Sequence, residues 1–531
     1  MSTSALVKKG EYHDSVTLML LAKALLALPG VRDAAAVMGT EANKGLLADA
    51  GLLTEEARAA EAGDLIISVQ AETLAQAEAA LAQAERLLKE RRLAKTGEGV
   101  AHRPKSLAAA LKHAPDANLA VISVAGRYAA REARLALEKG LHVFLFSDNV
   151  SLEDEIALKR LALEKGLLLM GPDAGTAIIN GIALGFANAI PRGPVGIVGA
   201  AGTGIQGVSV SITRAGSGVS QAVGVGGRDL SEAVGGMMMQ AAVRALQTDP
   251  ATKVLCLVSK PPAPGIARKV LETVRATGKP AVICFLGDDG AAAREAGLFP
   301  AATLDEAAIA SAALAQGQSP NHAVDEHRKV TAQSLGQRGE EAKGRFSPEQ
   351  RYVRGLFSGG TFCYEAQLVL RELLGVVRSN APLDKHDSLP DPNRSIGHTC
   401  VDLGADEFTV GRLHPMLDND LRVRRLLREA ADPETAVILL DVVLGYGAHP
   451  DPAGELAMAI RQAKADAERN GRHLAIVAYV CGVAGDPQGF TEQEEKLRAA
   501  GVILAPSNAA AARWAGLIAP ARAGNGEVRM R

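Results

Sequence analysis

GPVGIVGAAGTGIQG, residues 193–207, is an apolar run that turns through several glycines into a stretch with helical spacing. A strand, a glycine-rich turn and a helix in this order are typical of parallel α/β folds. Glycine lets the turn adopt positive φ, and the free N–H groups at the start of the helix can bind an anion. We therefore predict an anion site at Gly202, Thr203 and Gly204, where the threonine hydroxyl adds one more donor.

The same turn contains the pattern GxGxxG, which also occurs in dinucleotide-binding domains. A dinucleotide site needs an acidic residue at the end of the next strand. That strand ends in VGVGGRD, with Gly226 and Gly227 where the acid would stand and Asp229 slightly later. The sequence therefore favours a phosphate or carboxylate site over NAD, and a purely structural turn is the other alternative.

A second copy of the pattern occurs at residues 354–367, RGLFSGGTFCYEAQ. VDLGADEF (401–408) then echoes VGVGGRDL (223–230), and AVILLDVVLGYG (436–447) echoes KVLCLVSKPPAPG (253–265). Two copies of one parallel α/β domain explain this order. Two helix N-termini that meet would hold one phosphate better than either alone, whereas the alternative is a pair of ordinary tight turns. The donors of the second turn would be Ser358, Gly359, Gly360 and Thr361.

The patterns predict a multidomain α/β protein with five segments. Residues 1–96 are expected to form a ferredoxin-like or ACT-like α+β domain, and residues 100–191 a Rossmann-like domain with a parallel sheet. The two repeats cover residues 193–315 and 351–517. Residues 316–350 are polar with no strong apolar period, which is typical of a linker.

Three further segments carry candidate site residues. In MGPDAGTAI (170–178), Asp173 and Thr176 follow a strand, at the edge where open α/β sheets bind ligands, although a plain joining turn is equally consistent. Lys260 ends another strand and could bind an anion or be a solvated lysine. His414 and His449 each precede a proline in a loop, so they are candidate general acids or bases; the alternative is a structural role.

Composition excludes several classes of function. Lys+Arg (58) nearly equals Asp+Glu (60), so no basic surface is expected for nucleic acid or an anionic membrane. The five cysteines form no CxxC pair, which favours buried free thiols in a reducing compartment and no metal site. The first residues are polar and do not resemble a signal peptide, and the longest apolar stretch is interrupted by Lys23 and Pro29. We expect a cytoplasmic protein.

These segments resemble a known superfamily. Residues 117–265 resemble the alpha subunit of succinyl-CoA synthetase: the block that ends in MGPDAGTAI is similar to the second half of its CoA-binding domain, and GPVGIVGAAGTG to a strand followed by Ser-Gly-Thr. Residues 436–482 resemble the ligase half shared by both subunits. The whole chain, with GLFSGGTFCYEA, DEFTVGRLHPMLD and GYGAHPDP, is similar to the FdrA family. The resemblance implies a CoA-binding-like domain and two flavodoxin-like domains of the synthetase type.

The departures from succinyl-CoA synthetase are equally informative. The synthetase carries a phosphohistidine in a Gly-His-Ala-Gly loop, but the matching residues 285–297, FLGDDGAAAREAG, contain no histidine. SKPPAPG replaces the segment whose glutamate supports that histidine, and no nucleotide-grasp segment is recognised. MGTEANK stands in place of the glycine-rich first half of the CoA site. The resemblance therefore implies phosphate as a substrate and no certain cofactor, with CoA less expected.

FdrA-like proteins are linked, as a family, to oxamate carbamoyltransferase in allantoin breakdown, and they act beside companion subunits. The resemblance thus implies interconversion of oxalurate plus phosphate with oxamate plus carbamoyl phosphate. In that reaction His414 or His449 would protonate the departing nitrogen, and Lys260 or the glycine-rich turns would stabilise the oxyanion. Two alternatives stay open: an acyl-CoA synthetase that needs a partner, and a non-catalytic scaffold or regulatory subunit with the N-terminal domain as a sensor.

Overall fold

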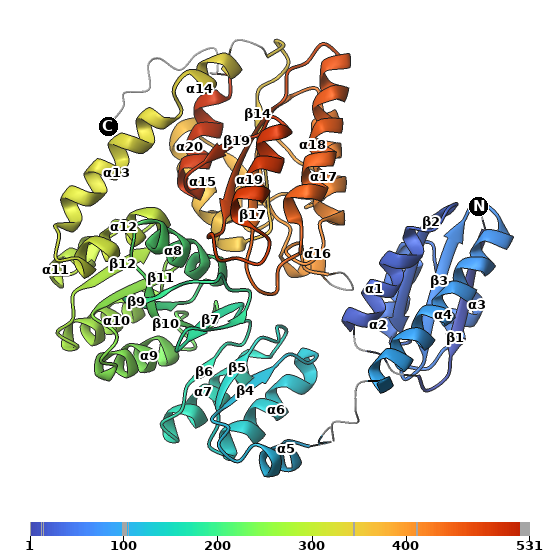
Figure 1. Ribbon diagram of the computed structural model, residues 1–531, viewed down its shortest axis with the longest axis horizontal. Helices are drawn as coiled ribbons and strands as arrows, with labels where there is room; N and C mark the ends of the chain where they lie inside the picture. The colour runs from blue at the N-terminus through green and yellow to red at the C-terminus, as the bar shows by residue number, and fades with distance from the viewer. Residues whose placement is uncertain are drawn as a thin grey trace. The chain divides into compact units, whose positions relative to one another are not determined.

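The computed structural model describes residues 2–11, 13, 15–97, 104, 106–343, 346–409 and 413–520. Two compact units are distinguished. One comprises residues 1–110 with 406–413, and the other comprises residues 111–405 with 414–531. Figure 1 colours the chain from blue at the N-terminus to red at the C-terminus.

The first unit is built on a three-stranded antiparallel sheet in the order β1-β3-β2, with strands Ser2–Lys8, Leu65–Ala71 and Val31–Met38. Alternate residues of β3 enter different cores. Leu65, Ile67 and Val69 pack with α1 (Ser15–Leu26) and α4 (Leu74–Gly97), whereas Ile66 packs with Leu47 and Ala57 of α2 and α3. Because side chains alternate along a strand, helices cover both faces of this sheet. The sequence indicated the strands and the long helices, and its helix-cap candidates Thr40 and Asn43 lie at the start of α2 (Glu41–Asp49), but it did not indicate α3 (Glu55–Ala59).

The second unit begins with a small parallel sheet in the order β4-β5-β6, formed by Leu119–Ile122, His142–Leu145 and Leu169–Met170. The helices between and before these strands are α5 (Leu107–His113), α6 (Gly126–Glu138) and α7 (Leu152–Glu164). The apolar strand sequences and the amphipathic α6 agree with the parallel α/β expectation.

The hairpin of β7 (Thr176–Ile179) and β8 (Ile182–Gly185) does not belong to that small sheet. It pairs through Ile178 with Ala222 of β10 and so extends the next sheet, although residues 100–191 were expected to form one domain. Asn180 and Gly181 at its tip have φ of 52° and 82°. Asn-Gly with positive φ at both positions is a typical two-residue hairpin turn, so the local sequence specifies the hairpin but not its partner strand.

The two repeats share one order of five strands. Their strand orders are β13-β12-β11-β9-β10-β7-β8 and β15-β16-β14-β17-β18-β19. In both, the strand before the glycine-rich turn lies between the next two long strands of its repeat, so the duplication inferred from the sequence is present in the fold. The first sheet has β9 (Arg192–Gly199), β10 (Val219–Gly224), β11 (Val254–Ser259), β12 (Ala281–Phe285) and β13 (Phe299–Pro300). The second has β14 (Tyr352–Phe357), β15 (Val377–Ser379), β16 (His398–Asp402), β17 (Thr435–Val443), β18 (Ala475–Cys481) and β19 (Ile503–Ala505).

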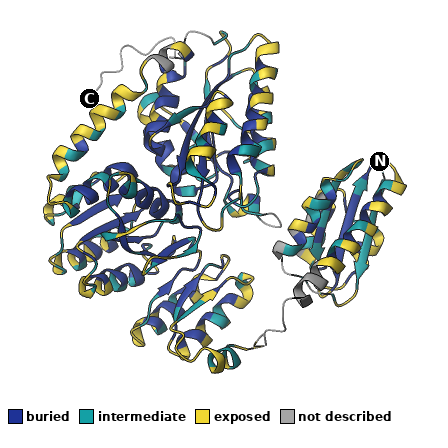
Figure 2. Cartoon of the chain, in the orientation of Figure 1, coloured by how far each residue is buried: buried dark blue, intermediate teal, exposed yellow. Residues whose placement is uncertain are grey.

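Helices accompany each strand in matching order. In the first repeat they are α8 (Gly202–Arg214), α9 (Met237–Thr248), α10 (Pro264–Ala276), α11 (Ala291–Glu295) and α12 (Leu304–Ala315). In the second they are α15 (Gly360–Leu374), α17 (Asp420–Ala431), α18 (Pro452–Arg469), α19 (Phe490–Ala499) and α20 (Asn508–Ile518), with the short α16 (Asp406–Thr409) and a 3₁₀ turn at Lys385–Asp387. Figure 2 shows the long strands of both sheets as buried.

The segment expected to be a linker is largely helical. It forms α13 (Pro320–Ser334), which begins with the capping side chain of Ser319, and α14 (Gly336–Lys343). His327 and Arg328 of α13 make ion pairs of 2.8 and 2.7 Å with Asp305 and Glu306 of α12. Polar contacts rather than an apolar stripe fix this helix, which is why the hydrophobic pattern did not reveal it.

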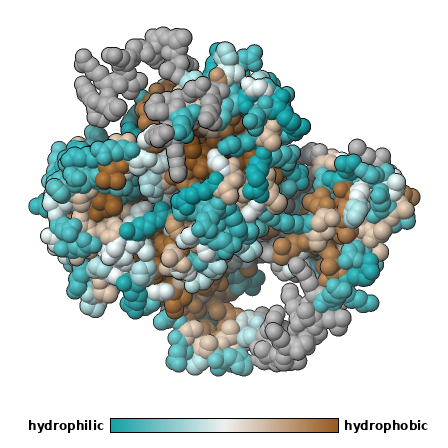
Figure 3. Space-filling view, turned by 45° about the horizontal axis from the view of Figure 1, so that its top comes forward, coloured by the Kyte–Doolittle hydropathy of each residue, from teal (hydrophilic) through white to brown (hydrophobic). Residues whose placement is uncertain are grey.

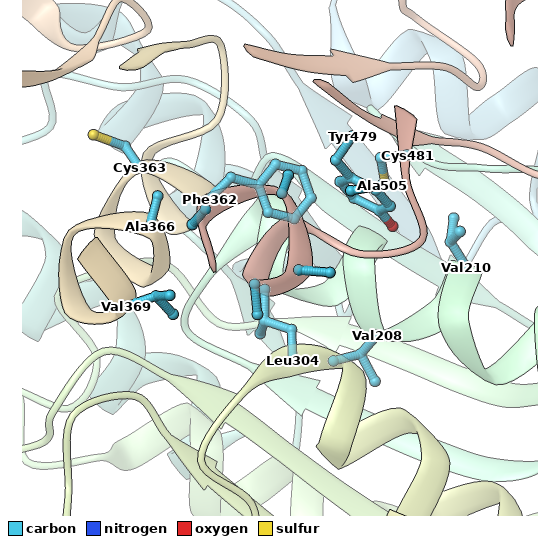
Figure 4. Close-up of a cluster of buried hydrophobic side chains, with 14 of the residues drawn as sticks. Val208, Val210, Leu304, Phe362, Cys363, Ala366, Val369, Tyr479, Cys481 and Ala505 are labelled. Atoms are coloured by element: carbon cyan, nitrogen blue, oxygen red, sulfur yellow. The ribbon is translucent and has the colours of Figure 1, made fainter. Parts of the chain in front are cut away.

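One hydrophobic core runs through both repeats (Figure 4). Phe362 of α15 meets Tyr479 of β18 edge to face, with ring centroids 5.6 Å apart. A Cβ on Gly207 of α8 would lie 2.8 Å from the Phe362 ring, so glycine allows the two helices to approach closely. All five cysteines are buried free thiols, and burial raises the pKa of Cys256 to about 12.

Figure 3 shows hydrophobic residues, in brown, gathered in patches among hydrophilic residues on the face that it draws. Among the described residues no helix is both long and apolar enough to cross a membrane.

Glu365 of α15 is a buried carboxyl group at the boundary between the repeats. Its oxygens accept the N–H of Leu304 at 2.7 Å and the side-chain amide of Asn508 at 2.8 Å. Burial, and then the charge of Asp305, raise the pKa of Glu365 to about 8. The chain thus keeps a proton at this boundary at neutral pH.

We expect this proton to appear in the pH dependence of stability. A carboxyl group whose pKa rises from 4.5 to about 8 on folding stabilises the fold fully below pH 4.5, and this contribution is lost as the pH rises through 8. Glu365→Gln should therefore remove up to about 1.4 kcal/mol per pH unit from the slope of unfolding free energy over that range. Denaturant unfolding at several pH values measures the slope. Glu372→Gln, on an exposed position of the same helix, should keep it; equal slopes for the parent and Glu365→Gln would refute the assignment.

Candidate active site

The N-termini of α8 and α15 lie against each other. The backbone N–H of Thr361 donates to Oγ1 of Thr203 at 3.3 Å. A Cβ on Gly359 would lie 2.6 Å from Cγ2 of Thr203, and a Cβ on Gly204 would lie 3.1 Å from Cγ2 of Thr361. The glycine-rich turns of the two repeats thus meet because neither has side chains in the way.

The second turn is already filled by a carboxylate of the chain itself. The N–H groups of Ser358 and Gly359 donate to Asp441 at 2.8 and 2.9 Å, and the Ser358 hydroxyl donates to it at 3.0 Å. Asp441 is fully buried and forms a 3.0 Å ion pair with Arg422. The expectation that Ser358 and Gly359 hold a substrate phosphate therefore needs correction, because their donors are used internally.

Gly360 and Thr361, the other expected ligands of the second turn, are also constrained. The Thr361 N–H is used by Thr203. A Cβ on Gly360 would lie 2.6 Å from a carboxylate oxygen of Asp402. Two carboxylates therefore stand at the N-terminus of α15, and a third anion would be repelled there.

The first turn is open by contrast. The backbone N–H groups of Gly202, Thr203 and Gly204 donate to none of the described residues, and Ile205, bonded to Ala201, makes the first helical hydrogen bond. The hydroxyl oxygen of Thr203 accepts from Thr361, so its own proton is available to a ligand. The N-terminus of α8 therefore offers amide donors, one hydroxyl and a favourable helix dipole to an anion.

The turn that precedes β7 forms a wall beside this site. A Cβ on Gly202 would lie 3.6 Å from Oγ1 of Thr176. That hydroxyl donates to the carbonyl oxygen of Phe186 at 2.7 Å. The proton of the Thr176 hydroxyl is therefore already used and does not serve a ligand. Asp173 is exposed and has a φ of 56°.

His414 presents an N–H group near the second turn. Its Nδ1 accepts the N–H of Met416 at 3.2 Å, so the neutral ring carries its proton on Nε2. Burial, and then the positive charge of Arg422, lower the pKa of His414 to about 4. At neutral pH the imidazole is therefore uncharged, and the expected role of an imidazolium acid is replaced by that of a neutral N–H donor. Gly411 and Arg412 of the same motif lie outside the described residues.

His449 has a different position from the one expected of a catalytic histidine. Its backbone N–H donates to the carbonyl of Met416 at 2.7 Å, which joins the two histidine loops. Its Nδ1 accepts the N–H of Asp451 at 3.0 Å, and its Nε2 lies 3.5 Å from Glu455. These contacts place the ring at the start of α18, where it organises the helix N-terminus.

Lys260 reaches from the first repeat to the second. It is exposed at the end of β11, and its Nζ lies 5.4 Å from the ring centroid of Tyr364, one turn into α15. The structure thus brings the strand-end lysine near the paired helices, on the side of α15.

Sequence reasoning missed Asp441, Arg422, Asp402 and Gly404. Asp441 gave a signal, since it is the single charge within the buried strand TAVILLDVV. Gly404 gave none. Nε2 of His414, the carbonyl oxygen of Ser358 and Oδ1 of Asp402 lie 2.7, 2.9 and 3.3 Å from the place of a Cβ on Gly404.

Gly404→Ala is therefore expected to displace His414 and reduce turnover about tenfold to a hundredfold, which corresponds to about 1.4–2.8 kcal/mol. The measurement is the rate of the reaction proposed below, together with the NMR pH titration of His414. Gly265→Ala is the control, because nothing lies within 4 Å of a Cβ there. An unchanged rate and an unchanged His414 titration in Gly404→Ala would contradict the geometry.

Three family models match the chain. The model described as "AllF, heavy metal-associated domain" matches residues 1–104, the CoA binding domain matches residues 192–287, and CoA-ligase matches residues 356–518. The CoA-binding match thus lies on the first repeat, whereas the sequence comparison above placed the CoA-binding-like domain at residues 100–191.

The N-terminal domain does not fit a heavy metal. Residues 1–104 contain no cysteine, although soft metals prefer thiolate ligands. Within the part of the chain that the structure describes, no three His, Cys, Asp or Glu side chains are grouped as metal ligands would be.

Individual proteins extend these matches. Succinate–CoA ligase [ADP-forming] subunit alpha 1 of Archaeoglobus fulgidus is 27% identical over 32% of this chain and 59% of its own length. The apo dinucleotide-forming acetyl-coenzyme A synthetase 1 of Ca. Korarchaeum cryptofilum is 17% identical over 75% of this chain and 82% of that chain, with a TM-score of 0.30. The uncharacterized protein YahF of Escherichia coli (strain K12) is 49% identical over 96% of this chain and 97% of its own. The chain therefore belongs to the YahF family, whose fold is that of the succinyl-CoA-synthetase-like superfamily.

Proposed function

We propose that this protein is an enzyme that transfers an acyl group between phosphate and a second small substrate, with phosphate bound at the N-terminus of α8. One observation carries the proposal. Asp441 occupies the donors of the second turn, whereas the amides of Gly202, Thr203 and Gly204 in the duplicated first turn have no acceptor among the described residues. The duplicated fold thus keeps one anion site and closes the other.

The surroundings suit acyl transfer. A phosphate oxygen held at α8 attacks the carbonyl carbon, a C–O bond forms, and the C–N bond to the leaving amide breaks. The proton of dihydrogen phosphate passes to the departing nitrogen, so no charged histidine is required. The neutral Nε2–H of His414 and the amides of the turn are the donors for the developing oxyanion, and loss of one such donor typically costs about 10²–10³ in rate.

A carbamoyl group is the acyl group that we propose. Residues 285–297 contain no histidine that could carry phosphate from ATP, which favours phosphate itself as the reactant. Together with the similarity to the FdrA family, this favours carbamoyl transfer between oxalurate and phosphate. Companion subunits are part of this proposal.

The second candidate is an acyl-CoA ligase that obtains its nucleotide-binding part from a partner. The matches to the CoA binding domain at residues 192–287 and to CoA-ligase at residues 356–518 favour it. In this function the α8 site would bind an acyl phosphate that CoA then attacks.

One set of assays separates the candidates. Carbamoyl phosphate and oxamate are supplied to the purified protein, alone and with the proteins that co-purify with it, and oxalurate and released phosphate are measured. We expect both products in equal amounts and no acid-labile histidine label from radioactive ATP. Formation of a thioester from CoA, a carboxylic acid and ATP, without oxalurate, would establish the ligase instead.

A further inference from the structure

A row of aromatic rings leads to His414. The centroids of Phe144 and Phe146 are 6.3 Å apart, those of Phe146 and Phe186 are 5.6 Å apart, and those of Phe186 and His414 are 5.4 Å apart. The chain has only 10 phenylalanines in 531 residues. Three of them in one row therefore concentrate a scarce residue type at one place.

Phe186 links these rings to the start of β7, which lies beside the N-terminus of α8. The N–H of Phe186 donates to the carbonyl of Gly175 at 2.8 Å, and its carbonyl accepts the Thr176 hydroxyl at 2.7 Å. Thr176 in turn lies beside Gly202 at the start of α8. The backbone thus holds Phe186 near the N-terminal turn of α8, and the Phe186 ring lies against His414.

Exposure singles out Phe146 within the row. Phe144 is fully buried and Phe186 is 9% exposed, whereas Phe146 is only partly buried. Phe146 directly follows β5, at the carboxyl edge of the small parallel sheet, and ligands of open α/β folds bind at this edge. A ring needed only for the core would be better placed deeper, as Phe144 is.

We infer that Phe146, backed by Phe186, is a specificity-determining residue whose ring faces the planar oxo-acid amide that exchanges the carbamoyl group with phosphate. This inference rests on the proposed function, because the substrate is the partner of the phosphate at α8. Flat amides and ureides pack well on aromatic faces, and an aromatic contact also excludes water from the carbonyl. The ring of Phe146 would select small substrates whose carbonyl groups are conjugated and coplanar, such as oxamate, over analogues of the same charge with a tetrahedral carbon beside the amide, such as malonamate.

Two variants of Phe146 test the inference. Phe146→Leu keeps an apolar side chain but removes the ring, and Phe146→Tyr keeps the ring. We expect Phe146→Leu to raise the dissociation constant and KM of oxamate about threefold to tenfold and to abolish the preference over malonamate. Phosphate affinity should not change, and Phe146→Tyr, which keeps the ring, should keep the preference for oxamate.

The measurements distinguish this inference from the proposed function. Direct binding of oxamate and malonamate is measured by calorimetry in the presence of phosphate, so it needs no turnover. If the parent makes no oxalurate but Phe146→Leu still loses the binding preference, the proposed transfer reaction is wrong and the role of Phe146 in specificity is supported. If Phe146→Leu binds both amides and discriminates between them as the parent does, Phe146 does not determine specificity, whatever the reaction is.

Discussion

Asp441→Ala is expected to lower the free energy of unfolding by about 3–5 kcal/mol, the usual cost of removing one partner of a buried ion pair. The carboxylate is fully buried and accepts three hydrogen bonds from Ser358 and Gly359. It also neutralises Arg422, which is 2% exposed. The variant leaves a buried guanidinium without its counter-ion and three donors without an acceptor.

Denaturant unfolding of the intact protein measures this loss. Asp420→Ala is the matched control, because Asp420 forms an exposed 2.8 Å ion pair with Arg424 on α17, the helix that also carries Arg422. Exposed pairs contribute about 0–1 kcal/mol. Added formate should restore part of the stability of Asp441→Ala, since a small carboxylate can replace the lost one. An effect of Asp441→Ala no larger than that of Asp420→Ala would show that the second turn does not depend on this anion.

Local sequence patterns predicted the strands, turns and helices that neighbouring residues specify. The strand, glycine-rich turn and helix at residues 193–207 and 354–367 were visible in sequence, and the common strand order of the two sheets follows from their repetition. The partner of a strand is a non-local property. The hairpin at residues 176–185 was therefore visible as TAIINGIALG, but its place beside β10 was not.

The same distinction applies to the candidate site. Both turns were found from their glycines, but the carboxylate that fills the second turn comes from Asp441, more than 80 residues further along the chain. No spacing rule links Asp441 to Ser358. His414 was found as a loop histidine, whereas its pKa of about 4 results from burial and from Arg422. Tertiary environment decides what a titratable side chain can do at neutral pH.

Asp441 also shows how the first turn can be tested. Thr203 occupies the second position of α8, where an aspartate would place a carboxylate among the open amides of Gly202 and Gly204, much as Asp441 does in the other repeat. We expect Thr203→Asp to weaken phosphate binding about 100-fold, since like charges brought together cost several kcal/mol and each 1.4 kcal/mol is tenfold in affinity. The fold should persist, because an acidic residue in the first turn of a helix is favourable.

Equilibrium dialysis with labelled phosphate measures the affinity, and Tm reports the fold. Thr203→Ser is the control, because it keeps the hydroxyl that accepts the Thr361 N–H and can still donate to the anion; its affinity should stay within about threefold of the parent's. Thr203→Asp places a carboxylate where Thr203→Ser keeps an uncharged hydroxyl, so the comparison tests a negative charge beside the turn. Phosphate bound by Thr203→Asp as tightly as by Thr203→Ser would mean that the anion does not bind at α8, and the transfer reaction would then lose its phosphate site.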